Sequence, residues 1–177
     1  MKYALVYGLL SGLVVSGVIV ASIAFAPDGG ALHSVWFGYL VMLVALTFIF
    51  VGVKRYRDVE RGGTIRFLPA FALGLGIAIV AAIAYVCAWE LYEASTGYRF
   101  MDEYIAAMIR DSRAGGASAA EIARQVAEMD EMRASYANPL FRIPMVFMEI
   151  FPVGLIVALI SAALLRNPRM LPARSRT

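Results

Sequence analysis

The sequence predicts an all-α membrane protein with four transmembrane helices, and three observations lead to this prediction. Of its 177 residues, 61% are apolar and 16% are charged, whereas soluble domains have about 45–50% apolar and about 25% charged residues. The mean hydropathy is +0.73. The charges lie between long uncharged stretches, and so many apolar side chains cannot be buried in one small core. A soluble globular protein is therefore excluded.

Four segments have the roughly 20 apolar residues that a helix needs to cross a hydrocarbon core. They are residues 3–26, 31–53, 67–89 and 143–165. Each is expected to be helical because unpaired backbone groups are too costly in lipid. None has the strict alternation of a transmembrane β-strand. We therefore expect a single transmembrane domain over residues 1–177.

The first segment also has features of a signal peptide, since Ala24-Phe25-Ala26 imitates a cleavage site. Its apolar stretch is longer than the roughly 7–15 residues of such peptides. Pro27 follows the imitated site, where its ring should obstruct a peptidase. We expect a retained transmembrane helix.

The distribution of Lys and Arg predicts the orientation. Segment 90–142 has six basic and nine acidic residues, whereas the other ten bases lie near residue 2, in the 54–66 loop and after residue 165. The positive-inside rule therefore places both termini and the 54–66 loop in the cytoplasm and segment 90–142 outside. Bases that flank apolar runs do not indicate a nucleic-acid partner, but they fit anionic lipid headgroups. The basic residues of the loop are Lys54, Arg55, Arg57, Arg61 and Arg66.

The outside segment, residues 90–142, predicts an amphipathic helical hairpin. The first helix, over 99–113, is expected to end at Gly115-Gly116, because glycine accepts the left-handed conformation of a helix C-terminus. Its apolar face follows helical spacing and consists of Met101, Tyr104, Ile105 and Met108.

Ser118-Ala-Ala-Glu121 fits a capping box and predicts the start of a second helix. Asn138-Pro139 is expected to end it. The hairpin fits three roles: a cap on the bundle, a surface for a partner, or a lid over a cavity. The apolar stripe of the second helix consists of Ile122, Val126, Met129, Met132 and Tyr136.

Small residues at every fourth position predict close packing between spans, because they let helix backbones approach each other. The alternative for the first row, Gly8-x-x-x-Gly12, is a contact in a homodimer. The three rows are Gly8, Gly12 and Ser16; Ala70, Gly74, Ala78 and Ala82; and Gly154, Ala158 and Ala162.

A candidate buried polar site centres on Glu149, the one charge well inside a span. We expect lipid to favour its neutral acid form, bound by Tyr85 or by the carbonyl that Pro152 leaves without a donor. Glu90 completes the candidate site, and it lies nearer the surface, as does His33. One interpretation is a structural tie between helices. The others are a proton or cation site with Glu90 and His33, or a divalent metal held by the same groups.

No motif of a nucleophilic, metal-dependent or nucleotide-binding enzyme occurs. We therefore expect no enzyme activity, no catalytic residue, no bound metal and no cofactor. The leading hypothesis is a non-enzymatic packing or binding protein, an accessory or sensing component with a second copy or another membrane protein as its partner. The alternative is a small transporter or channel that uses Glu149 as its proton or cation site.

Several stretches resemble a bacterial family of small four-helix membrane proteins classed as a domain of unknown function. The most distinctive is Glu149-Ile-Phe-Pro152-Val-Gly154, and the others are 48–58, 89–90, 115–122 and 138–141. The resemblance implies a protein of the bacterial cytoplasmic (inner) membrane with four spans. It implies no catalytic residue, and His33 lies outside the resembling stretches.

Overall fold

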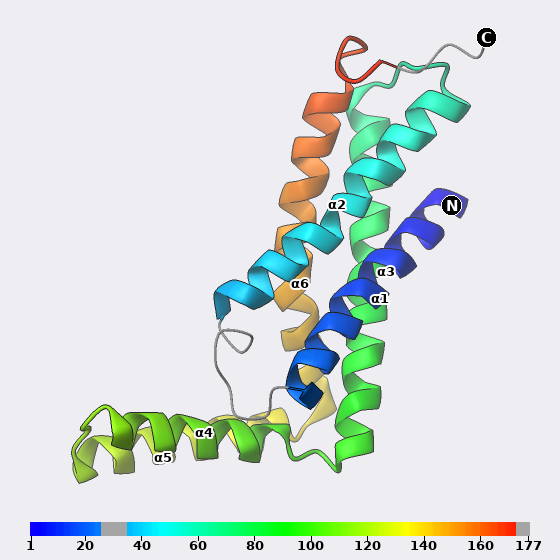
Figure 1. Ribbon diagram of the computed structural model, residues 1–177. Helices are drawn as coiled ribbons and strands as arrows, with labels where there is room; N and C mark the ends of the chain where they lie inside the picture. Colours follow the sequence, from blue (N-terminus) through cyan, green and yellow to red (C-terminus); the bar gives the residue numbers. More distant parts are fainter. Residues whose placement is uncertain (26–34, 173–177) are drawn as a thin grey trace. The chain divides into compact units, whose positions relative to one another are not determined.

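The computed structural model describes residues 1–25 and 35–172, and the described chain is all α-helical (Figure 1). Four of its helices are long and apolar enough to cross a membrane, and a shorter pair forms a hairpin between the third and fourth of these. The predicted fold class is therefore confirmed. The helices are α1 (Lys2–Phe25), α2 (Val35–Glu60), α3 (Phe67–Thr96), α4 (Phe100–Ala114), α5 (Ala119–Tyr136) and α6 (Pro139–Leu165).

The chain divides into two compact units, which are described separately below. Among the described residues, unit 1 consists of residues 1–25, 35–88 and 147–172, and unit 2 consists of residues 89–146. Helices α3 and α6 contribute to both units, because the divisions fall within them.

Three long helices extend beyond the limits that hydropathy predicts. Helix α2 continues past residue 53 to Glu60, α3 continues past residue 89 to Thr96, and α6 begins at Pro139 rather than at residue 143. Hydropathy marks where an apolar stretch ends, but backbone geometry decides where a helix ends. Gly63 and Gly97, with φ of +87° and +70°, follow the ends of α2 and α3, in a conformation that glycine adopts without strain.

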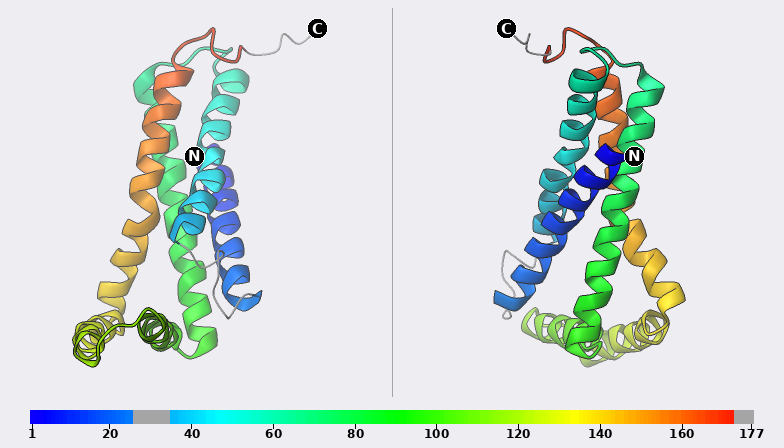
Figure 2. Two further views of the ribbon diagram at one scale, coloured as in Figure 1. Left: turned by 60° about the vertical axis from the view of Figure 1, so that its left-hand side comes forward. Right: turned by 90° about the vertical axis from the view of Figure 1, so that its right-hand side faces the viewer.

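In unit 1, α1 lies against α3 through the predicted small residues (Figure 2). A Cβ atom added at Gly8 would lie 2.5 Å from Cβ of Val80, and one added at Gly12 would lie 2.6 Å from Cβ of Ala84. The two glycines therefore allow a backbone approach that any side chain would prevent. The face of α1 that carries Gly8 and Gly12 would also suit a contact in a homodimer, but here it is occupied by α3 of the same chain.

The second close contact in unit 1 joins α3 to α6. Gly74 faces Ala158, and Gly154 faces Ala78, with 3.0 Å between an added Cβ and the facing Cβ in each case. The row of α3 and the row of α6 therefore interlock. Between α1 and α2, the Ser11 hydroxyl donates a 2.9 Å hydrogen bond to the carbonyl of Ala45.

In unit 2, α4 and α5 run side by side as the predicted hairpin (Figure 1). Gly116, with φ +82°, follows α4. Ser118 caps α5 with the predicted capping box, in which its hydroxyl accepts from the N–H of Glu121 and the Glu121 carboxylate accepts from the N–H of Ser118. These hydrogen bonds hold the pKa of the Glu121 carboxyl below its usual value.

The apolar faces of the hairpin meet in a small core. Its buried members are Met101, Ile105 and Tyr136. Tyr104, predicted on the same face, is instead 53% exposed, because the contact between α4 and α5 is narrower than the predicted stripe. The core is completed by Phe100, Ile109 and Met129.

We expect Gly12→Ala to lower the free energy of unfolding of the protein in detergent by about 1–3 kcal/mol, the usual cost of overpacking. The added methyl would meet Ala84 and the backbone carbonyl of Ala81, so that α1 and α3 must move apart. Gly17→Ala is the matched control, because an added Cβ there meets nothing within 4 Å. Thermal unfolding of both variants checks this, and equal melting temperatures would contradict it.

Candidate functional site

Glu149 and Tyr85, two members of the predicted polar site, lie together in unit 1. The Tyr85 hydroxyl donates a 3.3 Å hydrogen bond to Oε2 of Glu149. Tyr85 is buried, but the side chain of Glu149 is exposed on the surface of α6. The predicted hydrogen bond between Tyr85 and Glu149 is present, and a membrane or another chain would cover the part of the Glu149 side chain that the protein leaves exposed.

The other predicted members of the site are found in different settings. Pro152 lies one turn further along α6, which continues through it without interruption. Glu90 belongs to unit 2, where it binds Arg142. His33 lies outside the described residues. Within the described ranges, no three His, Cys, Asp or Glu side chains are grouped closely enough to hold a metal ion.

The predicted basic loop is partly helical, and its five bases have different environments. Lys54, Arg55 and Arg57 lie on the last turns of α2, and Arg61 and Arg66 lie beyond its end. Arg55, Arg61 and Arg66 are exposed, whereas Arg57 is fully buried.

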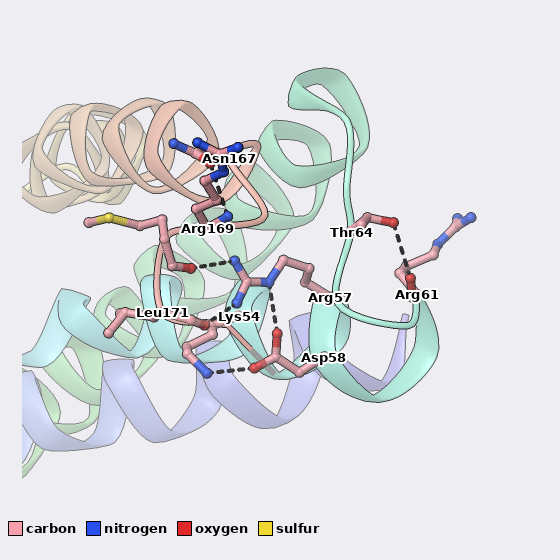
Figure 3. A network of polar contacts seen from close by, with 9 residues as sticks. Lys54, Arg57, Asp58, Arg61, Thr64, Asn167, Arg169 and Leu171 are labelled. Atoms are coloured by element: carbon pink, nitrogen blue, oxygen red, sulfur yellow. Dashed lines mark hydrogen bonds and ion pairs between the residues drawn. The ribbon is translucent and has the colours of Figure 1, made fainter. Parts of the chain in front are cut away.

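The guanidinium of Arg57 joins the end of α2 to the segment after α6 (Figure 3). Its Nη1 and Nη2 donate to the backbone carbonyls of Met170 and Leu171 at 2.9 and 2.6 Å. Its Nε donates to Asp58 at 2.7 Å, and Lys54 binds the other oxygen of that carboxylate. The buried charge is thus both paired and hydrogen-bonded, as a stable buried arginine requires.

Leu171 adopts a backbone conformation that is unusual for its type. Its φ is +47°, in the left-handed region that side chains other than glycine and asparagine seldom enter. The hydrogen bonds from Arg57 bind this turn. The segment after α6 is therefore held by a side chain from α2 rather than by helical structure of its own.

Unit 2 contains a second buried arginine, Arg142, near the start of α6. Its side chain is 3% exposed, and Nε and Nη2 donate to the two oxygens of Glu90 at 2.7 and 2.6 Å. Nη1 donates to the backbone carbonyl of Tyr136. The guanidinium also lies 5.1 Å from the ring centre of Tyr98 and 5.6 Å from that of Tyr136. This bidentate, aromatic-flanked geometry fixes the ends of α3, α5 and α6 together.

Tyr136 connects this arginine to the indole of Trp89. The Trp89 Nε1–H donates a 2.7 Å hydrogen bond to the Tyr136 hydroxyl. Burial raises the pKa of Tyr136, and the nearby carboxyl of Glu93 raises it further, so that the hydroxyl stays neutral. We call Trp89, Glu90, Glu93, Tyr136 and Arg142 the Arg142 cluster.

A cavity of about 400 Å³ lies beside the Arg142 cluster within unit 2. Glu93, Tyr136 and Arg142 line it. Glu93 is 1% exposed, and its Oε1 has no hydrogen-bond partner among the described residues. At the rim, Tyr98 holds a left-handed φ of +58°, and its N–H donates to the carbonyl of Glu93. A cavity with an unsatisfied buried acceptor is a candidate binding site.

The sequence interpretation missed the Arg142 cluster and the special role of Arg57. Both arginines follow the rule that Lys and Arg flank apolar runs, which indicates topology and, for Arg57, contact with anionic lipid headgroups. One signal is present in the sequence: Trp89-Glu90 lies at the end of the third span, and Tyr136 and Arg142 lie shortly before the fourth. Residues at the end of one span and at the start of the next can meet, because the chain between the two spans returns to the same side of the membrane. Which of these residues form contacts is seen only in the structure.

The chain belongs to a family described as "Protein of unknown function (DUF4199)", whose model matches residues 2–167. The match covers nearly the whole chain and both units. No curated protein and no solved structure matches it significantly.

We expect Arg57→Met to lower the free energy of unfolding by about 3 kcal/mol, the scale for breaking a buried, hydrogen-bonded charge network. Methionine keeps the apolar stem but leaves the carbonyls of Met170 and Leu171 without their donors. Arg55→Met is the matched control, because Arg55 is exposed on the same turn of α2. Equal unfolding temperatures for the two variants in detergent would contradict the role of Arg57.

Proposed function

We propose that this protein is a non-enzymatic membrane component that acts by binding, as an accessory or sensing subunit. Unit 2 is the proposed binding part. The supporting observation is the Arg142 cluster beside a cavity, with one buried carboxylate oxygen that has no partner in the described part of the chain. In the described part of unit 1, the buried polar side chains are Arg57 and three serines, Ser11, Ser16 and Ser161.

We further propose a bacterial cytoplasmic-membrane location, with both termini in the cytoplasm and α4 and α5 outside. The excess of Lys and Arg near residue 2, over 54–66 and after 165 supports this orientation. Arg55 and Arg66 are exposed and are suited to anionic lipid headgroups, whereas Arg57 is committed to Met170 and Leu171. A second copy or another membrane protein is the proposed partner of the exposed spans.

Reporter fusions test this orientation. An alkaline phosphatase fused after Arg66 should be inactive, and one fused after Gly116 should be active, because this enzyme folds only outside the cytoplasm. A fluorescent protein that folds only in the cytoplasm should give the opposite pattern at the same two sites. Phosphatase activity after Arg66, or none after Gly116, would contradict the proposed topology.

A second candidate function is transport of protons or cations, and one observation favours it. Glu149 is an exposed carboxyl inside a helix that is apolar enough to span a membrane. Ionisable groups at such depth often belong to ion pathways. Against transport, the four spans offer few other polar side chains in their buried interior, and a single carboxyl does not form a path.

We expect proteoliposomes that contain the protein to hold a pH gradient or a Na⁺ or K⁺ gradient for as long as empty liposomes do. An enclosed pH-sensitive dye, with ion-sensitive dyes for the two cations, provides the measurement. Glu149→Gln, which keeps the shape but cannot ionise, should behave in the same way. A faster loss of the gradient that Glu149→Gln abolishes would overturn the binding proposal and support transport.

Native mass spectrometry of the protein in mild detergent tests the binding part of the proposal. We expect a retained lipid, small molecule or protein partner, lost when residues of the Arg142 cluster are changed. Glu149→Leu serves as the control, since it changes unit 1 only. Retention that is insensitive to the cluster would contradict the assignment of binding to unit 2.

A further inference from the structure

The cavity in unit 2 carries an electrostatic imbalance that suggests what it binds. Its lining brings together two aromatic rings, two acids and two bases: Tyr98, Tyr136, Glu93, Asp102, Arg133 and Arg142. The bases are already paired. Arg142 binds both oxygens of Glu90, and Arg133 lies 2.6 Å from Asp102. Glu93 is the acid of this group that has no basic partner at ion-pair distance among the described residues.

Glu93 is 1% exposed, so bulk solvent hardly reaches it. A buried acceptor without a donor is costly, and more so when it is charged. The Tyr136 hydroxyl accepts a hydrogen bond from Trp89, and the single proton that it can donate satisfies at most one other acceptor. The last torsion of a glutamate side chain is broad and roughly two-fold, and Glu93 lines the cavity, so a carboxylate oxygen can face it.

A partner with a positive charge and an N–H donor would satisfy both the charge and the unpaired oxygen of the Glu93 carboxylate. A metal ion would need more ligands, and the described residues have no group of three His, Cys, Asp or Glu that could hold one. A quaternary ammonium ion has the charge but no N–H. A primary ammonium group has three N–H donors, is compact, and also interacts favourably with the faces of tyrosine rings.

We infer that unit 2 binds a primary ammonium group in this cavity, with the carboxylate of Glu93 as its acceptor. The inference rests on the proposed function, since it names the ligand chemistry of the proposed binding unit. Two sources supply this group: a soluble amine or the headgroup of an ethanolamine lipid. Glu93 and Arg142 lie on the end turns of two helices of spanning length, where a lipid headgroup would be met.

The test uses tryptophan fluorescence of the full-length Trp36→Phe protein, whose remaining indole is Trp89. Trp89 reports on the cluster because it is hydrogen-bonded to Tyr136 at the cavity. In nanodiscs of phosphatidylcholine, ethanolamine should shift the emission in a saturable way, whereas tetramethylammonium of equal charge should not. Nanodiscs that contain phosphatidylethanolamine should show the shifted emission without added amine if the lipid is the source.

Glu93→Gln should weaken ethanolamine binding at least about tenfold, as expected for losing a hydrogen bond to a charged group. Glu131→Gln is the matched control, because it removes one negative charge from an exposed position of α5 in the same unit. Its dissociation constant should equal that of the parent protein. Thermal unfolding establishes that each variant is folded, and the comparison of the two amines in the unmutated cavity does not depend on any variant.

Three results would overturn the inference: no saturable response to ethanolamine in either lipid, an equal response to tetramethylammonium, or unchanged affinity in Glu93→Gln. None of these three results decides the proposed function, which is tested by the native mass spectrometry and flux experiments described above. A different molecule retained in native mass spectrometry by the Arg142 cluster would refute the ammonium ligand while supporting binding by unit 2. Glu149-dependent flux would refute the proposed function whatever Trp89 reports.

Discussion

Small residues in α1, α3 and α6 let α1 and α6 approach α3 closely, and the rest of unit 1 depends on this approach. Gly8 and Gly12 of α1 pack against one side of α3, and Gly154 of α6 packs against another. In a membrane, apolar side chains gain little by leaving lipid for protein, so close contact and dispersion hold helices together. The unit therefore needs few polar ties in its interior, and the hydrogen bond from Ser11 to Ala45 is of that kind.

Two buried guanidinium groups hold the chain where its long helices end. In unit 1, Arg57 joins α2 to the segment after α6. In unit 2, Arg142 joins α6 to α3 and to the end of α5. Each guanidinium donates to three oxygen atoms in fixed directions, which a lysine ammonium does not reproduce. The helices are thus connected by geometry that only arginine provides.

Much of this fold follows from the sequence, because its determinants are local. Hydropathy gives four spans, Ser118 and Glu121 give the start of α5 through a capping box, and the small-residue rows indicate contact faces. The pairing of residues distant in sequence does not follow in this way. Arg57 with Leu171, and Arg142 with Glu90, depend on where helices end, and the exposed position of Glu149 depends on which face α6 turns to its neighbours.

The way in which Arg57 holds the segment after α6 has an evolutionary consequence. The guanidinium binds main-chain carbonyls of Met170 and Leu171, which every amino acid possesses. Side chains at these positions are therefore free to vary among relatives, with glycine or asparagine well suited to the left-handed backbone of residue 171. The number of residues between the end of α6 and this turn is not free, because one insertion or deletion moves both carbonyls out of reach. Selection in this segment should act on length more than on residue identity.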